Sequence, residues 1–173
     1  PPGCTGPCRG GRECREFFSV QLVSTKMYKH FFKRFIDVVL AFIGVVVLAL
    51  PMLIIALVIK LDSRGPAFFK QVRLGLNGKE FTLLKFRSMC VNAEAQGSGV
   101  YSEKGDARVT RIGKIIRATS LDELPQLINI LRGDMSFIGP RPLLVEYLPL
   151  YNDKQRRRHE VRPGLSGYAQ VNG

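Results

Sequence analysis

VVLAFIGVVVLALPMLIIALVI, residues 38–59, is an unbroken apolar run that contains one glycine and one proline. None of its 22 side chains carries a charge or a hydrogen-bonding group. A run of this length needs a lipid bilayer or the centre of a much larger protein. Because the whole chain has only 173 residues, we predict a membrane segment over residues 27–64 and a separate folded domain over residues 65–173.

Pro51 and the flanking charges bear on how this segment meets the bilayer. Proline removes a backbone hydrogen bond and clashes with the preceding turn, and residues 38–50 alone would reach only about 20 Å as a helix. Cations lie on both sides of the run, whereas a spanning helix normally carries its excess on one side. We therefore predict a re-entrant helix-break-helix, with a straight span as the alternative.

Residues 1–26 differ in composition from the rest of the chain. They begin with PPGCTGPCRGG, which is rich in turn residues, and they lack the apolar core of a signal peptide. We expect a disordered extension upstream of a start at Met27. It contributes a net charge of +2, so most of the formal net charge of +12 belongs to the remainder.

The strongly basic balance predicts anionic partners. No basic motif with interleaved aromatic residues is present, so we predict membrane lipids and nucleotide phosphates as partners and no nucleic acid. The four cysteines form no disulfide framework, which indicates a reducing compartment.

Beyond residue 66 the sequence predicts a β-hairpin. Residues 67–74 and 80–87 are rich in β-forming side chains and flank a turn at residues 75–79. Strand alternation places two pairs of polar side chains each on one face, Gln71 with Arg73 and Lys85 with Arg87. Such a patch could receive phosphates, or it could be a solvated face that protects an exposed edge.

The remaining segments predict a loop and short helices. Residues 92–108 have the composition of a loop, residues 112–117 form a short basic amphipathic stretch, and residues 151–160 are strongly basic. Apolar residues at helical spacing predict a helix that Gly133 ends: Leu124, Leu127, Ile128 and Leu131. The expected fold is α-dominated α+β, a monotopic membrane protein with a small hairpin and interfacial amphipathic helices.

Asp122 and Glu123 stand side by side in SLDELPQL, residues 120–127. Ser120 and Glu123 fit a capping box, which would need no chemistry. Pro125 is comfortable only in a first helical turn, so the helix could instead begin near Asp122, with both carboxylates at its positive end. One carboxylate could then face a phosphorus atom while the other held Mg²⁺. Propensity does not decide between the cap and the site.

Gly139-Pro140-Arg141-Pro142 is a second distinctive motif. Its two prolines fix the backbone on either side of one arginine, and a guanidinium held in this way suits bidentate recognition of phosphate. The alternative is an ordinary turn with a surface arginine. Arg162 precedes Pro163 and repeats the theme more weakly.

Taken together, these motifs resemble the bacterial monotopic phosphoglycosyl transferases, also called bacterial sugar transferases. The resemblance extends from Met27 to Gly173, and residues 142–149 are similar to the subgroup that serves protein-glycan and related surface-glycan pathways. It is carried by KRFID at 33–37, QVRLG at 71–75, KFRSM at 85–89, SLDELPQLIN at 120–129, GDMSFIGPRP at 133–142 and VRPG at 161–164.

The resemblance implies transfer of a sugar 1-phosphate from a UDP-sugar, expected to be N-acetylated, to undecaprenyl phosphate with release of UMP. This would be the first membrane step of surface-glycan or glycoprotein glycan assembly, on the cytoplasmic face of the bacterial inner membrane. By analogy Asp122 would form a covalent phosphosugar intermediate and Glu123 would bind Mg²⁺. The expected substrate-binding residues are Gln71, Arg73, Lys85, Arg87, Arg117, Pro140, Arg141, Pro142 and Arg162.

Two departures from the family pattern and two rival functions remain. Leu50 precedes Pro51 where many members have serine, and the family continues beyond Gly173, so we expect a catalytic domain that is truncated at its C-terminus. A non-catalytic membrane anchor with a basic face is one rival, and a hydrolase that uses the same acids is the other. The pathway and the oligomeric state, including a homodimer, stay open.

Overall fold

The computed structural model of the protein describes residues 13–91, 93 and 106–171. Most of the loop expected at residues 92–108 and the first part of the expected extension therefore lie outside the described residues. The chain divides into two compact units, Pro1–Ile36 and Asp37–Gly173. Apart from the first part of helix α1, every element described below belongs to the second unit.

Helix α1 is a single α-helix, Glu13–Asp62. It begins inside the segment 1–26, so the described part of that segment is helical, where we had expected disorder. The physical reason lies in the sequence, because residues 13–43 contain neither glycine nor proline and nothing stops the helix before Gly44.

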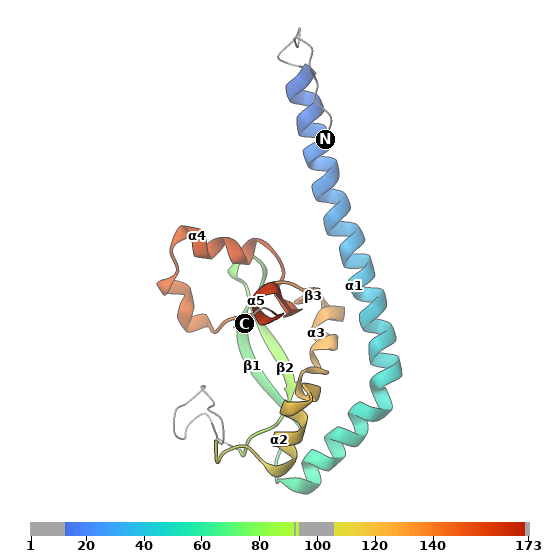
Figure 1. Ribbon diagram of the computed structural model, residues 1–173, viewed down its shortest axis with the longest axis vertical. Coiled ribbons are helices and arrows are strands. Elements are labelled where there is room, and N and C mark those ends of the chain that lie inside the picture. Colours follow the sequence, from blue (N-terminus) through green and yellow to red (C-terminus); the bar gives the residue numbers. More distant parts are fainter. Residues whose placement is uncertain (1–12, 92, 94–105, 172–173) are drawn as a thin grey trace. The chain divides into compact units, whose positions relative to one another are not determined.

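Pro51 lies inside α1 and does not divide it into two helices. The helix instead bends in its second half (Figure 1). An internal proline removes one backbone hydrogen bond and crowds the preceding turn, which accounts for a bend. In place of the predicted helix-break-helix, the structure therefore has one bent helix.

The stretch Phe31–Asp62 of α1 is long and apolar enough to cross a membrane. Only 6% of its most apolar window is buried, whereas a core helix of a water-soluble domain would be mostly buried. A helix that leaves this much apolar surface exposed indicates membrane association.

The other face of α1 contributes to the core of the folded domain. Ala41 is fully buried in one cluster with Leu83, Leu127, Ile130 and Met135. Nearer the end of the helix, Ile59 forms a second cluster with Ala67, Phe86 and Ile116. The domain is therefore built directly on the apolar helix.

The predicted hairpin is confirmed. Strand β1, Phe68–Leu74, pairs antiparallel with strand β2, Glu80–Phe86, and the 3-10 turn η1, Leu76–Gly78, connects them. Phe68 stacks on Phe86 at the open end, with ring centroids 5.3 Å apart. Helix α3, Gln126–Arg132, lies alongside β2 (Figure 1).

Two short segments precede α3. Helix α2, Arg111–Ala118, is capped by Thr110, whose hydroxyl accepts from the backbone N–H of Gly113 at 2.9 Å. The 3-10 turn η3, Leu121–Glu123, follows it. Gly133 ends α3 with φ of 100°, as predicted, because this left-handed conformation favours glycine.

A parallel pair of short strands was not predicted. Strand β3, Ser136–Ile138, pairs with strand β4, Gly164–Ser166. A Cβ on Gly164 would collide with the backbone nitrogen of Gly139, so the two chain segments approach closely because both positions are glycine.

The chain between β3 and β4, and the chain after β4, form short helical turns. Much of the basic stretch 151–160 is exposed, as expected of a surface that faces solvent or lipid headgroups. Its elements and their neighbours are η4, Val145–Leu150; α4, Asp153–Arg156; η5, Arg157–Glu160; and α5, Tyr168–Val171.

Candidate active site

Asp122 and Glu123 lie on the turn η3, between α2 and α3. Of the two alternatives that the sequence leaves open, the capping box is not formed, because Ser120 has φ of 55° and ψ of 18° and its side chain makes no capping hydrogen bond. The carbonyl of Ser120 instead accepts from the backbone N–H of Glu123 at 3.2 Å. The left-handed serine turns the chain after α2, so both carboxylates project from one tight turn.

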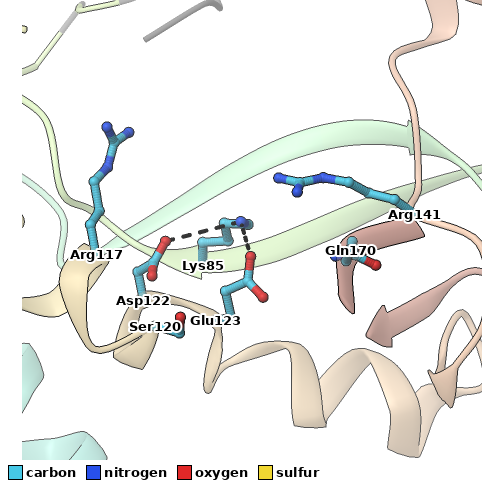
Figure 2. A pocket seen from close by; sticks show the side chains of 7 residues that line it. All are labelled: Lys85, Arg117, Ser120, Asp122, Glu123, Arg141 and Gln170. Carbon is cyan, nitrogen blue, oxygen red and sulfur yellow. Dashed lines mark hydrogen bonds and ion pairs between the residues drawn. The ribbon is translucent and has the colours of Figure 1, made fainter. Parts of the chain in front are cut away.

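Lys85 on β2 reaches both carboxylates. Its Nζ lies 2.7 Å from Oε1 of Glu123 and 4.0 Å from Oδ2 of Asp122. Figure 2 shows the ammonium group between the two acids, with the side chain of Arg141 directed toward it from the other side of the pocket. An ammonium in this position offsets the repulsion between neighbouring carboxylates.

These groups line a cleft of about 420 Å³. The volume falls within the range of ligand pockets, and the lining is largely polar and charged. Arg117 stands on the Asp122 side of the cleft and Arg141 on the Gln170 side (Figure 2). The lining residues are Lys85, Arg117, Ser120, Asp122, Glu123, Arg141 and Gln170.

A smaller recess, of about 30 Å³, shares four of these side chains with the cleft. The shared residues are Lys85, Glu123, Arg141 and Gln170. Arg73 and Pro142 are among the further residues that line the recess. The predicted cationic strand face therefore contributes one arginine from β1 and one lysine from β2.

The two arginines beside the cleft are supported in different ways. Nε of Arg117 donates to Oγ of the buried Ser88 at 2.8 Å. The carbonyl of Arg141 accepts from the guanidinium of Arg158 at 3.2 Å. The loop before Arg141 is held through its backbone, because the carbonyl of Pro140 accepts from the N–H of Gly164 at 3.0 Å.

The pKa of Asp122 is raised above its ordinary value, chiefly because burial penalises the charged carboxylate. Nearby Lys85 opposes this rise in pKa, Glu123 adds to it, and Arg117 again lowers the pKa. Asp122 is thus a desolvated carboxyl group beside cations, which is the setting expected of a reactive acid.

The structure brings most of the predicted site residues together. Asp122, Glu123, Lys85, Arg117 and Arg141 line the cleft, and Arg73 and Pro142 line the recess. Gln71 accepts from Nε of Arg73 at 3.1 Å, and Pro140 supports the loop through its carbonyl, but neither is among the lining residues.

Arg87 and Arg162, also predicted to bind substrate, are engaged elsewhere. Arg87 is only 6% exposed, and its guanidinium donates to the carbonyls of Ser63 and Arg64. Strand alternation does not place Arg87 on the same face as Lys85, because β2 ends at Phe86, one residue before Arg87. Nε of Arg162 donates to the carbonyl of Gly133 at 2.9 Å, at the negative end of α3.

Sequence reasoning missed Ser120 and Gln170 as lining residues. Ser120 was considered only as a helix cap, and its left-handed backbone carries no strong sequence signal, since serine seldom adopts it. Gln170 lies on α5 and lines the cleft together with Arg141 from the loop after β3. No local sequence pattern predicts this long-range arrangement of α5 and the loop after β3.

Asp122 and Glu123 are the carboxylates available for a divalent cation in this cleft. Among the described residues, no group of three or more His, Cys, Asp or Glu side chains could hold a metal ion. Mg²⁺ usually takes one or two carboxylates and completes its shell with water and substrate phosphates. Glu123 is one carboxylate of this kind, so Mg²⁺ at this cleft stays a prediction.

Comparison with known proteins identifies the family. The sequence profile of the bacterial sugar transferases matches residues 28–173, and the chain belongs to this family. It is 49% identical over 141 residues to "Uncharacterized sugar transferase EpsL" of Bacillus subtilis (strain 168), covering 82% of this chain and 68% of that protein.

Two other relatives have more specific names. The chain is 48% identical over 145 residues to "UDP-glucose:undecaprenyl-phosphate glucose-1-phosphate transferase" of Caulobacter vibrioides, covering 82% of the chain and 54% of the relative. It is 46% identical over 144 residues to "UDP-N-acetylgalactosamine-undecaprenyl-phosphate N-acetylgalactosaminephosphotransferase" of Aeromonas hydrophila, covering 82% and 34%. The chain therefore spans about half and about a third of these two relatives.

Proposed function

We propose that this chain carries the site of a UDP-sugar:undecaprenyl-phosphate sugar-1-phosphate transferase. The observation that supports it most is one cleft in which Lys85 lies between Asp122 and Glu123, with Arg117 and Arg141 on its two sides. Three cationic side chains in one cleft suit the diphosphate of a nucleotide. The names of two relatives contain a UDP-sugar, which carries such a diphosphate.

The chemistry proceeds in two displacements at one phosphorus atom. A carboxylate oxygen of Asp122 attacks the phosphorus that bears the sugar, the bond from that phosphorus to the bridging oxygen breaks, and UMP leaves with the electron pair. A phosphate oxygen of undecaprenyl phosphate then attacks the same phosphorus, and the carboxylate of Asp122 leaves. Covalent catalysis of this kind divides one difficult displacement into two easier ones.

The neighbouring residues prepare both steps. Partial burial of Asp122 weakens the hydration of its carboxylate, which strengthens its electrostatic interactions with the neighbouring cations. Lys85, Arg117 and Arg141 bind phosphate oxygens and stabilise the charge that develops on them. Glu123 would hold Mg²⁺, which when bound neutralises charge on the diphosphate.

The bent helix α1 would hold this cleft at the lipid surface. We propose that α1 enters and leaves the cytoplasmic leaflet as a re-entrant helix, bent at Pro51. The support is the bend, the exposed apolar surface of Phe31–Asp62 and the cations at both ends of the apolar run.

Thiol labelling of sealed vesicles tests this topology. Lys33→Cys and Arg64→Cys, each in a background without other cysteines, should react with a membrane-impermeant reagent from the same side. Labelling from opposite sides would establish a straight span instead.

An N-acetylated donor sugar stays our prediction. The named relatives include one for UDP-glucose and one for UDP-N-acetylgalactosamine, so the family allows both kinds of sugar.

A UMP-release screen across UDP-sugars, with and without undecaprenyl phosphate and Mg²⁺, tests the proposed activity. We expect repeated turnover only when donor, acceptor and Mg²⁺ are all present. A hydrolase would release UMP at the same rate without the acceptor. A membrane anchor would release none with any donor, and either result would overturn the proposal.

A further inference from the structure

Asn129 joins the strand that carries Lys85 to the helix that follows the two acids. Its side chain on α3 is fully buried, with 0% exposure. Oδ1 accepts from the backbone N–H of Leu84 at 3.0 Å, and Nδ2 donates to the carbonyl of Thr82 at 2.7 Å. One carboxamide therefore makes two hydrogen bonds to the backbone of β2.

These two backbone groups are the ones that a neighbouring strand would pair. Residues 82 and 84 are two apart, so their N–H and C=O groups point to the same edge of β2. Asn129 thus takes the place of a third strand at that edge. Nδ2 also donates to Oδ2 of Asp134 at 3.3 Å, so both of its hydrogens are used.

The backbone of Asn129 is fixed as firmly as its side chain. Its carbonyl accepts from the N–H groups of Gly133 and Asp134, both at 3.1 Å. The residue therefore has little freedom to follow β2 if the strand moves. It ties the strand to the closed end of α3.

The consequence for the cleft follows from chain connectivity. Lys85 comes directly after Leu84 on β2, while Glu123 precedes the start of α3 by three residues. The apolar contacts between Leu83 and α3 hold the two elements together, but such contacts are non-directional and allow sliding. Hydrogen bonds at two points along the strand allow only one register.

We propose that Asn129 is a positioning residue that sets the register of β2 against α3 and so holds Lys85 between Asp122 and Glu123. This inference rests on the proposed function, because the rate that Asn129 would affect is the rate of that proposed reaction. Misplacing a charged group by about 1 Å can slow the chemical step by on the order of 10²-fold.

The test compares Asn129→Leu with a matched control on the same helix. Leucine has a similar size and no charge but makes neither bond to β2. The control is Ile130→Val or Ile130→Ala, whichever lowers the thermal midpoint by the same amount, because Ile130 is equally buried and its side chain is apolar. For each variant, quenched-flow mass spectrometry gives the rate constant and the amplitude of adduct formation on Asp122 with donor and Mg²⁺ but without acceptor.

A positioning role and a structural role give different results. If Asn129 positions Lys85, the rate constant in Asn129→Leu falls about 10²-fold, and the control keeps the wild-type rate constant. If Asn129 serves only the fold, both variants lose amplitude and keep the rate constant, and the inference is overturned.

A second measurement needs no turnover. Acylation of surface amines, read by peptide mass spectrometry, compares Lys85 with the exposed Lys114 in the same sample. Release of Lys85 from its ion pair should raise its labelling relative to Lys114 several-fold in Asn129→Leu and leave it unchanged in the control. Unchanged labelling of Lys85 in the variant overturns the inference.

This labelling also separates the two proposals. If the wild-type protein forms no adduct with any donor, the proposed function fails, and the labelling alone decides the role of Asn129.

If Asn129→Leu does not fold, Asn129→Ser is measured in its place. A small neutral side chain leaves room for water to bond to the backbone N–H of Leu84 and the carbonyl of Thr82.

Discussion

The two sides of the cleft present an arginine by different means. On one side Arg117 extends from α2 and is held by the hydroxyl of Ser88, next to the turn that carries the acids. On the other side Arg141 lies in a loop whose backbone is bound to the segment that begins at Gly164. The first side depends on side-chain bonds, and the second depends on two backbones in close contact.

The difference shows where each side is vulnerable. A side chain on the first side can be shortened without disturbing the backbone, so its loss affects the chemistry more than the fold. The second side has no room for an added atom at Gly139 or Gly164, so even a methyl group there affects the fold first. Substitutions on the first side should therefore change the rate, and substitutions on the second should change the stability.

Replacing the proposed nucleophile should give the largest effect. Asp122→Asn should lower the rate of UMP release by on the order of 10⁴-fold or more, because an amide cannot form the covalent intermediate. The variant should keep the wild-type unfolding transition or a higher one. Turnover within tenfold of wild type would contradict the role of Asp122.

The second side should respond to one added methyl group. Gly164→Ala should lower the free energy of unfolding by about 3 kcal/mol, because the new Cβ collides with the backbone of Gly139. Gly78→Ala is the control, since it has open space and only the strain of a positive φ, and should cost about 1 kcal/mol. Denaturant unfolding measures both, and equal losses would remove the contrast.

A pair of arginines separates binding from folding. Arg117→Gln should reduce kcat/KM roughly 10- to 100-fold and leave stability nearly unchanged, because it removes a charged contact to phosphate. Arg87→Gln should mainly lower the unfolding midpoint, because Arg87 is bound to Ser63 and Arg64. Unfolding scans and steady-state kinetics on both variants measure these effects. A loss of stability in Arg117→Gln together with a loss of kcat/KM in Arg87→Gln would contradict the roles given to the two arginines.

The smallest predicted effect is a pH-dependent gain in stability. Burial raises the pKa of Asp122 in the folded protein, so its stability falls as pH rises from the ordinary aspartate pKa through the raised pKa. Asp122→Asn removes this loss, so the variant should unfold at a higher temperature than wild type at neutral pH. This gain in unfolding temperature should vanish below the ordinary aspartate pKa. A gain that did not depend on pH would show that the raised pKa of Asp122 is not its cause.

Much of this molecule could be predicted from local patterns. The apolar run, the hairpin and the stop at Gly133 are all written in residues close together in the chain, as are the acid pair and Arg141. Side-chain periodicity and turn chemistry carry that information directly.

The failures share a physical cause, which is that long-range packing overrides local preference. Ser120 fits a cap by sequence, yet it lies in a left-handed turn between α2 and η3, where its side chain makes no capping bond. Arg87 fits strand alternation, yet β2 ends one residue earlier and the guanidinium binds the end of the membrane segment. The β3–β4 pair joins segments separated by some 25 residues, which no local period can reveal.

The most direct test of the account is the intact mass of the protein after incubation with donor and Mg²⁺ in the absence of acceptor. The account predicts that the wild-type protein gains the mass of one sugar phosphate, that undecaprenyl phosphate removes it, and that Asp122→Asn gains nothing. The same mass gain on Asp122→Asn, or turnover by a wild-type protein that never carries the adduct, would contradict covalent catalysis by Asp122.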